Sequence, residues 1–404
     1  MSSSRSLDVA RVCALAGLCL AVACGGLSGG PDGEPSTPRF GGEGATSGAP
    51  LPGDRLLPPR HAREGAGGSG APSRGPSEPA PFEPEAIPMP FRGVNLAGAE
   101  FGDVLPGAEG RDYEWPTSSE VDYFVAKGMN TFRVGFKWER LQPSAFGGLV
   151  SAYLAKLDGL VAYATAKGAR VILNPHNFAR YYGDIVGSAK VPASAFADLW
   201  RRLALLYGDN PRVMFNLVNE PNTMPTEQWV AAANAAIAAI RAAGAGNVIH
   251  VPGNGWTGAH SWTSSYYGTP NAEAMLDVVD PIDNVLFEVH QYLDRSSGGE
   301  SDQCVSKTIG RERLAGFVAW LRATGKKGFV GEFAGGDNPT CNAAIADMLA
   351  SMMEASDVLV GWVWWAAGPA WGNSYPFSLH PNNGKDKPQM NLLEPHLAAT
   401  KSTL

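Results

Sequence analysis

Cysteine and histidine are scarce in this chain of 404 residues, which contains five cysteines and seven histidines. No H-E-x-x-H motif and no other close pair of histidines is present, so we expect no metal site. A lone histidine is usually structural, and we assign that role to His250, His260, His380 and His396.

Basic charge is also low. The chain has 32 Lys and Arg against 39 Asp and Glu, which gives a net charge of −7. A nucleic-acid partner needs a basic stripe that neutralises its phosphates, and the sequence has none. We therefore expect no nucleic-acid partner.

An apolar run long enough to span a membrane is missing at the N-terminus. Val12–Ala23 is too short, and with its small residues at the end it is typical of an export signal at residues 1–23. Cys24 follows at once, as in a lipoprotein signal, although Leu20 stands one position earlier than usual there. We expect an exported protein, either secreted or held at a membrane by a lipid on Cys24.

Glycine and proline dominate residues 25–90, where they contribute 15 and 14 of the 66 residues. The aromatic side chains of this stretch are Phe40 and Phe82 alone. Such a segment buries too little apolar surface to offset the entropy lost on ordering, so residues 25–86 are predicted to form a disordered linker. Residues 87–404 then form the folded domain.

Beyond residue 90, short β-rich runs alternate with helical stretches such as Leu199–Tyr207, Thr226–Ala243 and Arg311–Thr324. This alternation predicts a parallel sheet with crossover helices. Eight runs favour a closed (β/α)₈ TIM barrel over an open doubly wound sheet. The first run also lacks the G-x-G-x-x-G turn of a dinucleotide fold, and we expect no cofactor. The runs are Phe91–Gly98, Asn130–Phe136, Arg170–His176, Val213–Pro221, Asn247–Asn254, Asn284–Tyr292, Gly328–Gly336 and Leu359–Ala367.

Polar side chains gather at the ends of these runs. In a barrel of this kind, the carboxyl ends of the strands carry the active site, so these side chains should converge there. They are Arg133, His176, Asn219, Glu220, His290, Tyr292 and Glu332, followed by Trp365 in the last run.

The two carboxylates, Glu220 and Glu332, indicate glycoside hydrolysis. That chemistry needs one protonated group to assist the leaving oxygen and one ionised group to attack the sugar or activate water. We expect Arg133 to keep Glu332 ionised, and the charge of Glu332 to raise the pKa of Glu220. Glu288 shares a strand face with His290, and we expect it inside the barrel in a structural or supporting role.

Asn219-Glu220-Pro221 after an apolar strand resembles the acid/base motif of glycoside hydrolase family 5, and the resemblance extends through residues 91–380. The motifs look most like those of the subfamily 5 endo-β-1,4-glucanases, although that family more often has Thr in place of Gly331. They are Gly93-Val94-Asn95-Leu96-Ala97-Gly98, Phe132-Arg133-Val134 with Trp138, His176-Asn177-Phe178-Ala179-Arg180, Pro252-Gly253-Asn254-Gly255-Trp256, His290-Gln291-Tyr292-Leu293-Asp294, Gly331-Glu332-Phe333 and Trp365-Ala366-Ala367-Gly368.

The resemblance implies a retaining endo-β-1,4-glucanase that hydrolyses cellulose or soluble β-glucan, with Glu220 as acid/base and Glu332 as nucleophile. It further implies a supporting role for five side chains. Arg133 and Tyr292 would position Glu332, His176 and His290 would bind sugar and shape the site, and Asn219 would contact the sugar 2-hydroxyl.

Aromatic residues near strand ends suit a glycan cleft, because flat sugar faces stack on aromatic rings. We expect substrate contacts from Trp365 as the sugar platform and from Trp256, Tyr181, Trp371 and Asn95. Tyr181 stands where relatives often have Trp. By contrast, Trp200, Trp229 and Trp320 lie on helical patterns and are predicted to be core.

Cys304 and Cys341 are the even pair left outside the signal region, which suggests one disulfide in an exported chain. Two free buried thiols are the alternative. In the family that the chain resembles, a disulfide occurs at this place.

Two other functions stay open on the sequence alone. A β-mannanase or a xyloglucanase of the same fold would have the same catalytic set, because the loops decide specificity. A non-catalytic surface glycan-binding protein would usually lack one of the two carboxylates. No second folded module is visible, which favours soluble or amorphous β-glucan, and we expect a monomer.

Overall fold

The computed structural model describes residues 89–372 and 374–397. The predicted signal peptide at residues 1–23, Cys24 and the predicted linker at residues 25–86 lie outside these ranges. Among the helices of the two described ranges, none has both the length and the apolar character needed to cross a membrane.

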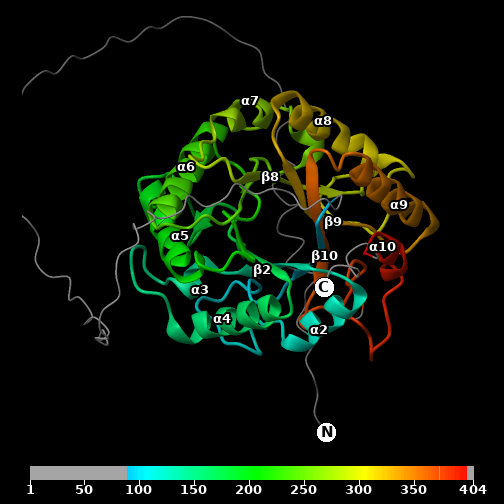
Figure 1. The fold of residues 1–404 in the computed structure, drawn as a ribbon, viewed down its shortest axis with the longest axis horizontal. Helices are drawn as coiled ribbons and strands as arrows, with labels where there is room; N and C mark the ends of the chain where they lie inside the picture. Colours follow the sequence, from blue (N-terminus) through cyan, green and yellow to red (C-terminus); the bar gives the residue numbers. More distant parts are fainter. Residues whose placement is uncertain (1–88, 373, 398–404) are drawn as a thin grey trace, which may run out of the picture. The chain divides into compact units, whose positions relative to one another are not determined.

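The eight predicted strands close into a parallel barrel, with the order β1-β10-β9-β8-β7-β6-β3-β2 around the ring. Figure 1 shows the helices outside this ring. The predicted (β/α)₈ barrel is confirmed. Its strands are β1 (Phe91–Leu96), β2 (Thr131–Phe136), β3 (Arg170–Pro175), β6 (Val213–Asn216), β7 (Ile249–Pro252), β8 (Val285–Tyr292), β9 (Gly328–Ala334) and β10 (Leu359–Ala367).

The helices follow the strands with small differences from the predicted bounds. The helix predicted from Leu199 begins six residues earlier, at Ala193, because Ala-rich residues precede the apolar pattern. The helices are α2 (Ser118–Lys127), α3 (Trp138–Leu141), α4 (Ser151–Ala166), α5 (Ala193–Tyr207), α6 (Thr226–Ala242), α7 (Asn271–Ala274), α8 (Ile309–Thr324), α9 (Pro339–Glu354) and α10 (Met390–Leu397), with 3₁₀ turns η1 (Ala259–Ser261) and η2 (Met275–Asp277). A short antiparallel pair, β4 (Arg180–Tyr181) and β5 (Asp184–Ile185), was not foreseen, since two residues per strand show no periodicity.

Apolar packing fills the space between strands and helices. The predicted core residues Trp200 and Trp229 are fully buried, and Trp320 is 8% exposed. A separate buried cluster lies on the strands themselves and contains Phe91, Ile172, Met214, Leu286, Phe329, Val360 and Val363. The barrel is therefore a packed scaffold that can hold side chains rigidly at its carboxyl end.

Strand register brings functional positions to one level of the barrel. Asn95 on β1 pairs with Arg133 on β2, and His290 on β8 pairs with Glu332 on β9. Neighbouring residues in a parallel ladder point to the same face of the sheet. The four side chains therefore enter the same end of the barrel.

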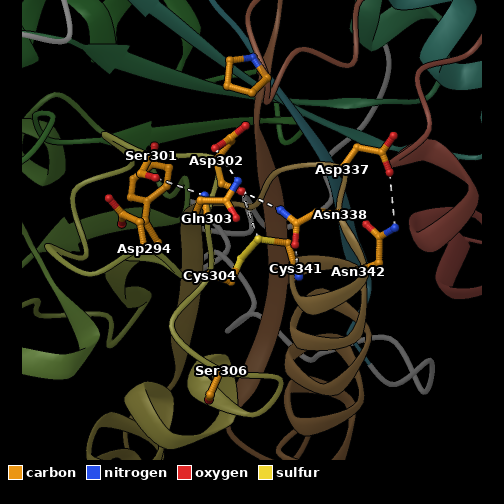
Figure 2. The surroundings of a disulfide bond; sticks show 12 residues. Asp294, Ser301, Asp302, Gln303, Cys304, Ser306, Asp337, Asn338, Cys341 and Asn342 are labelled. Atoms are coloured by element: carbon orange, nitrogen blue, oxygen red, sulfur yellow. Dashed lines mark hydrogen bonds between the residues drawn. A yellow bond between two sulfur atoms is a disulfide. The ribbon is translucent and has the colours of Figure 1, made fainter.

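A disulfide joins the loop after β8 to the first turn of α9, as Figure 2 shows. Cys304 and Cys341 form this bond across 37 positions of sequence. Beside it, the Asn338 side chain accepts a hydrogen bond from the backbone N–H of Cys341 at 3.0 Å and donates to the Asp302 carbonyl at 2.8 Å. The bond and the N-cap together attach this loop to α9.

Candidate active site

Glu332 on β9 is a hydrogen-bonded carboxylate at the barrel mouth, with only 3% of the residue exposed. Arg133 Nη1 donates to Oε1 at 2.9 Å, and the Tyr292 hydroxyl donates to Oε2 at 2.6 Å. The donors come from β2 and β8, on different sides of the ring. Both carboxylate oxygens are therefore oriented by the barrel itself.

The guanidinium of Arg133 links several strands, and the residue is 1% exposed. Apart from Glu332, it donates from Nη1 to Asn95 Oδ1 at 2.9 Å and from Nη2 to Asn219 Oδ1 at 2.7 Å. Nη2 also lies 3.3 Å from Glu288 Oε1. The planar fork of donors suits Arg to such a node, because each N–H has a fixed direction.

Asn95 lies at the same level of the barrel as Arg133 and is 2% exposed. Its amide group donates to the backbone oxygens of Gly331 and Trp364 at 2.9 and 3.1 Å. Its Oδ1 accepts from Arg133, so the side chain helps to orient this arginine.

Glu220 reaches the mouth from the segment after β6, which ends at Asn216 and not at Pro221 as predicted. Its backbone φ is 43°, in the left-handed region that non-glycine residues rarely occupy. Asn222 Nδ2 donates to the Glu220 carbonyl at 3.0 Å, and Trp256 N donates to the Pro221 carbonyl at 3.0 Å. This hydrogen-bonded turn is what aims the Glu220 side chain at the site, at the expense of local strain.

One oxygen of Glu220, one oxygen of Glu332 and a ring nitrogen of His290 lie within 4.8 Å of one another. His290 Nδ1 is 2.6 Å from Glu220 Oε1, a hydrogen-bond distance. Two ligands of a tetrahedral zinc ion stand roughly 3.3–3.4 Å apart when each bond is about 2.0–2.1 Å. The 2.6 Å contact between His290 and Glu220 is therefore a hydrogen bond and is shorter than the separation of two such ligands.

Opposing effects act on the ionisation of Glu332. Burial raises its pKa, and the charge of Glu220 adds to the rise, while His290, Arg133 and the Tyr292 hydrogen bond oppose it. The net pKa is raised, and desolvation is the largest cause, since only 4% of the Glu332 side chain is exposed.

The two histidines of the site carry different charges. Burial lowers the pKa of His290, but Glu332, Glu220 and Glu288 outweigh burial and raise it to about 9. His290 is therefore a cation at neutral pH. Burial and the nearby cations hold the pKa of His176 well below its usual range, so that ring is neutral.

Trp365 and Trp256 keep part of their surface open at the strand ends. Trp365 stacks on His176 with ring centroids 5.5 Å apart and an interplanar angle of 30°, and its Nε1 donates to the Tyr375 hydroxyl at 3.0 Å. Trp256 lies 6.0 Å from the Tyr267 ring. These two indoles remain candidates for sugar platforms. Tyr375 was missed by the sequence reasoning, because it lies in an irregular segment after β10 with no pattern to mark it.

Tyr181 and Trp371, two further residues expected to contact substrate, are mostly buried. Tyr181 is 7% exposed and donates from its hydroxyl to the Gln142 carbonyl at 2.6 Å. Trp371 is 6% exposed and stacks on Tyr375 with centroids 3.9 Å apart. Both side chains are occupied by protein packing, whereas the neighbouring Tyr182 is 50% exposed.

A (β/α)₈ barrel that brings two carboxyl groups together at the carboxyl ends of its strands has the architecture of a glycoside hydrolase. The model of the cellulase family, glycosyl hydrolase family 5, matches residues 88–368. The chain belongs to this family.

Known relatives agree with this assignment. An endo-β-1,4-glucanase B from Aspergillus niger is 44% identical over 293 residues, which cover 72% of this chain and 85% of the relative. The structure of the endo-β-1,4-glucanase Xac0029 from Xanthomonas axonopodis pv. citri has a TM-score of 0.75 and 48% identity, covering 77% of this chain and 99% of that one. The structure of XacCel5A in complex with cellopentaose has a TM-score of 0.76 and 47% identity, with coverage of 77% and 100%.

Proposed function

We propose that this protein is a retaining endo-β-1,4-glucanase. The observation that carries the proposal is the placement of Glu220 and Glu332, whose nearest oxygens lie within 4.8 Å. Retaining enzymes have carboxyl groups about 5–5.5 Å apart, whereas inverting enzymes hold them about 6.5–9.5 Å apart to admit a water. The short separation supports direct attack by one of the two groups.

Glu332 is the nucleophile in this proposal, because Arg133 and Tyr292 orient both of its oxygens. Its carboxylate attacks the anomeric carbon, and the bond from that carbon to the leaving oxygen breaks as the oxygen takes the proton of Glu220. The product is a glycosyl ester on Glu332 together with a shortened glucan that leaves. A bound substrate that excludes water from the site also strengthens each charge interaction there.

The second step reverses the role of Glu220. Its carboxylate removes a proton from a water, whose oxygen attacks the anomeric carbon and breaks the ester bond to Glu332. Glu332 returns as a carboxylate and Glu220 as an acid. Two displacements at one carbon restore the β configuration, so the first product is the β-anomer.

The named relatives support β-1,4-glucan as the substrate, since two are called endo-β-1,4-glucanases and a third was solved with cellopentaose. The alternatives are mannan and xyloglucan, which the same catalytic pair could hydrolyse. Initial rates on carboxymethyl-cellulose, barley β-glucan, mannan and xyloglucan test the proposal. A higher kcat/KM on mannan or xyloglucan than on either glucan would refute it.

Export is part of the proposal, and it is supported by the N-terminal apolar run and by the disulfide, a bond that persists in oxidising compartments. Residues 25–86 would then act as a flexible spacer before the catalytic domain. Lipid attachment at Cys24 is the finer hypothesis. Mass spectrometry of the mature N-terminus distinguishes a lipidated Cys24 from a chain cleaved by an ordinary signal peptidase.

A further inference from the structure

Glu288 is a fully buried carboxylate that the double-displacement chemistry does not use. It lies on β8 with 0% exposure, two positions before His290. Its Oε1 is 3.3 Å from Arg133 Nη2 and 3.3 Å from His290 Nε2, and its Oε2 is 2.9 Å from His250 Nδ1. Both oxygens thus face donor groups of three other side chains.

Gly331 on β9 leaves room for the carboxyl group of Glu288. A Cβ added at Gly331, directly before Glu332, would lie 2.5 Å from the Glu288 carboxyl carbon. A side chain there would push Glu288 away from its partners. The glycine and the carboxylate therefore belong to one arrangement beneath the nucleophile.

A buried carboxylate is costly unless it is paired, and an apolar side chain would fill the same volume at lower cost. The charges of the cluster suggest what Glu288 does. Glu332 and Glu288 supply two negative charges, and Arg133 and a cationic His290 supply two positive ones. Loss of Glu288 would remove one of the two negative charges that lie against Arg133 and His290.

We propose that Glu288 is a positioning residue, whose carboxylate keeps His290 as an imidazolium facing Glu220 and holds Arg133 against the nucleophile Glu332. The inference rests on the proposed glycosidase function and deepens it. Glu288 itself does not touch the sugar, since it acts through His290 and Arg133.

The contacts of His290 agree with this role. Its Nδ1 faces Glu220 at 2.6 Å and Glu332 at 3.5 Å, and its Nε2 faces Glu288 at 3.3 Å. Because both ring nitrogens meet carboxylate oxygens, only the doubly protonated ring can donate on both sides. Arg133 on β2, His176 after β3 and Tyr292 on β8 also lie around this ring, and His250 on β7 lies beyond Glu288.

A titration of the full-length wild-type protein labelled with ¹⁵N-histidine tests the proposal without any turnover. The His290 resonances are assigned by their loss in His290→Asn. We expect both ring nitrogens to be protonated at pH 7 and to titrate above pH 8. A neutral His290 ring at pH 7 in the wild-type protein would overturn the proposal.

The pH dependence of kcat/KM gives the second test. Glu288→Gln keeps the shape and removes the charge, so the pKa of His290 should fall. The alkaline limb, where His290 loses its proton in this proposal, should then move to lower pH by about one unit or more. Glu288→Asp retains the charge and should keep the limb near its wild-type position while the rate falls. An unchanged alkaline limb in folded Glu288→Gln would show that the residue only fills space.

Asp280→Asn is the matched control. Asp280 is also a buried carboxylate paired with an arginine, Arg241, at 2.8 Å, but it lies before β8 and outside the site. The Asp280→Asn substitution should lower the melting temperature and leave the pH profile of kcat/KM unchanged. If wild type hydrolyses no β-1,4-glycan, the proposed function fails, while the histidine titration compared between wild type and Glu288→Gln still decides the role of Glu288.

Discussion

The phenol of Tyr292 donates a 2.6 Å hydrogen bond to Oε2 of Glu332, the carboxylate oxygen that Arg133 does not contact. This bond favours the ionised form of a group whose pKa is raised by burial. Since Glu332 must be ionised to attack, the bond affects both the rate and the pH range of the reaction.

Tyr292→Phe should therefore lower kcat/KM by about 10- to 150-fold, because a hydrogen bond to a charged group contributes about 1.5–3 kcal/mol. Without this donor the pKa of Glu332 rises further, so the carboxylate becomes protonated at a higher pH. The acidic limb of kcat/KM should move upward in pH. Tyr207→Phe, which removes a hydroxyl bonded to Asp158 on the helical side, is the control, and an acidic limb that stays in place would contradict the role of Tyr292.

The two carboxylates should respond differently to substitution. Glu332→Gln should be nearly inactive on every substrate, since no nucleophile remains. Glu220→Ala should recover its first step on an aryl glycoside whose leaving group needs no proton, and azide should then speed turnover and give a β-glycosyl azide. Proton NMR of the first product is the direct check, and an initial α-anomer would exclude retention.

Trp365 and Trp256 are partly exposed and Trp371 is buried, so the three residues allow a test of the sugar platform. Trp365→Ala and Trp256→Ala should stay folded and lose kcat/KM by roughly 5- to 150-fold, if sugar stacking contributes roughly 1–3 kcal/mol as base stacking does. Trp371→Ala should instead lose about 3–5 kcal/mol of folding stability, because it empties a buried site. Thermal unfolding measured beside the kinetics separates the two effects; loss of the folded state in Trp365→Ala would favour a packing role there.

The bond between Cys304 and Cys341 should stabilise the domain. In the chain-entropy description, a loop of 37 residues corresponds to about 3–4 kcal/mol, less any strain. The Cys304→Ser/Cys341→Ser double variant should unfold at a lower temperature, and reductant should have the same effect on wild type. Peptide mass spectrometry without reductant tests the pairing, which two alkylatable thiols in the exported protein would rule out.

Removal of the segment before the barrel should have little effect. A chain that begins at Ile87 retains Phe91–Leu96, the first barrel strand, and every residue of the site. Its melting temperature and its kcat/KM on soluble glucan should match those of the longer protein. A large loss of either quantity would mean that residues 25–86 pack against the domain.

Much of the barrel and its catalytic pair could be predicted from the sequence. The alternation of β-rich runs and helical stretches marks the eight strands, because a parallel strand buried on both faces reads as a short apolar run. The convergence of Arg133, Tyr292 and Glu332 could be predicted from their places near strand ends, since the carboxyl ends of barrel strands meet. Closure of the barrel then brings these side chains into contact.

Loop conformation and electrostatic balance were decided only in three dimensions. Tyr181 and Trp371 stand near strand ends as Trp365 does in sequence terms, yet they are more buried than Trp365, because loop geometry sets how much of each ring stays open. The contact between Asn95 and Arg133 likewise appears only in three dimensions.

The sequence by itself predicted the fold, since the apolar run of each strand is a local pattern, and it proposed the two carboxylates from their places at strand ends and from the family motifs. The tertiary structure decided the surroundings of each group. The pKa of Glu332 and that of His290 depend on how much water is excluded and on which charges lie within a few ångströms. Those distances join residues from four or more strands, and no single segment of the sequence contains them.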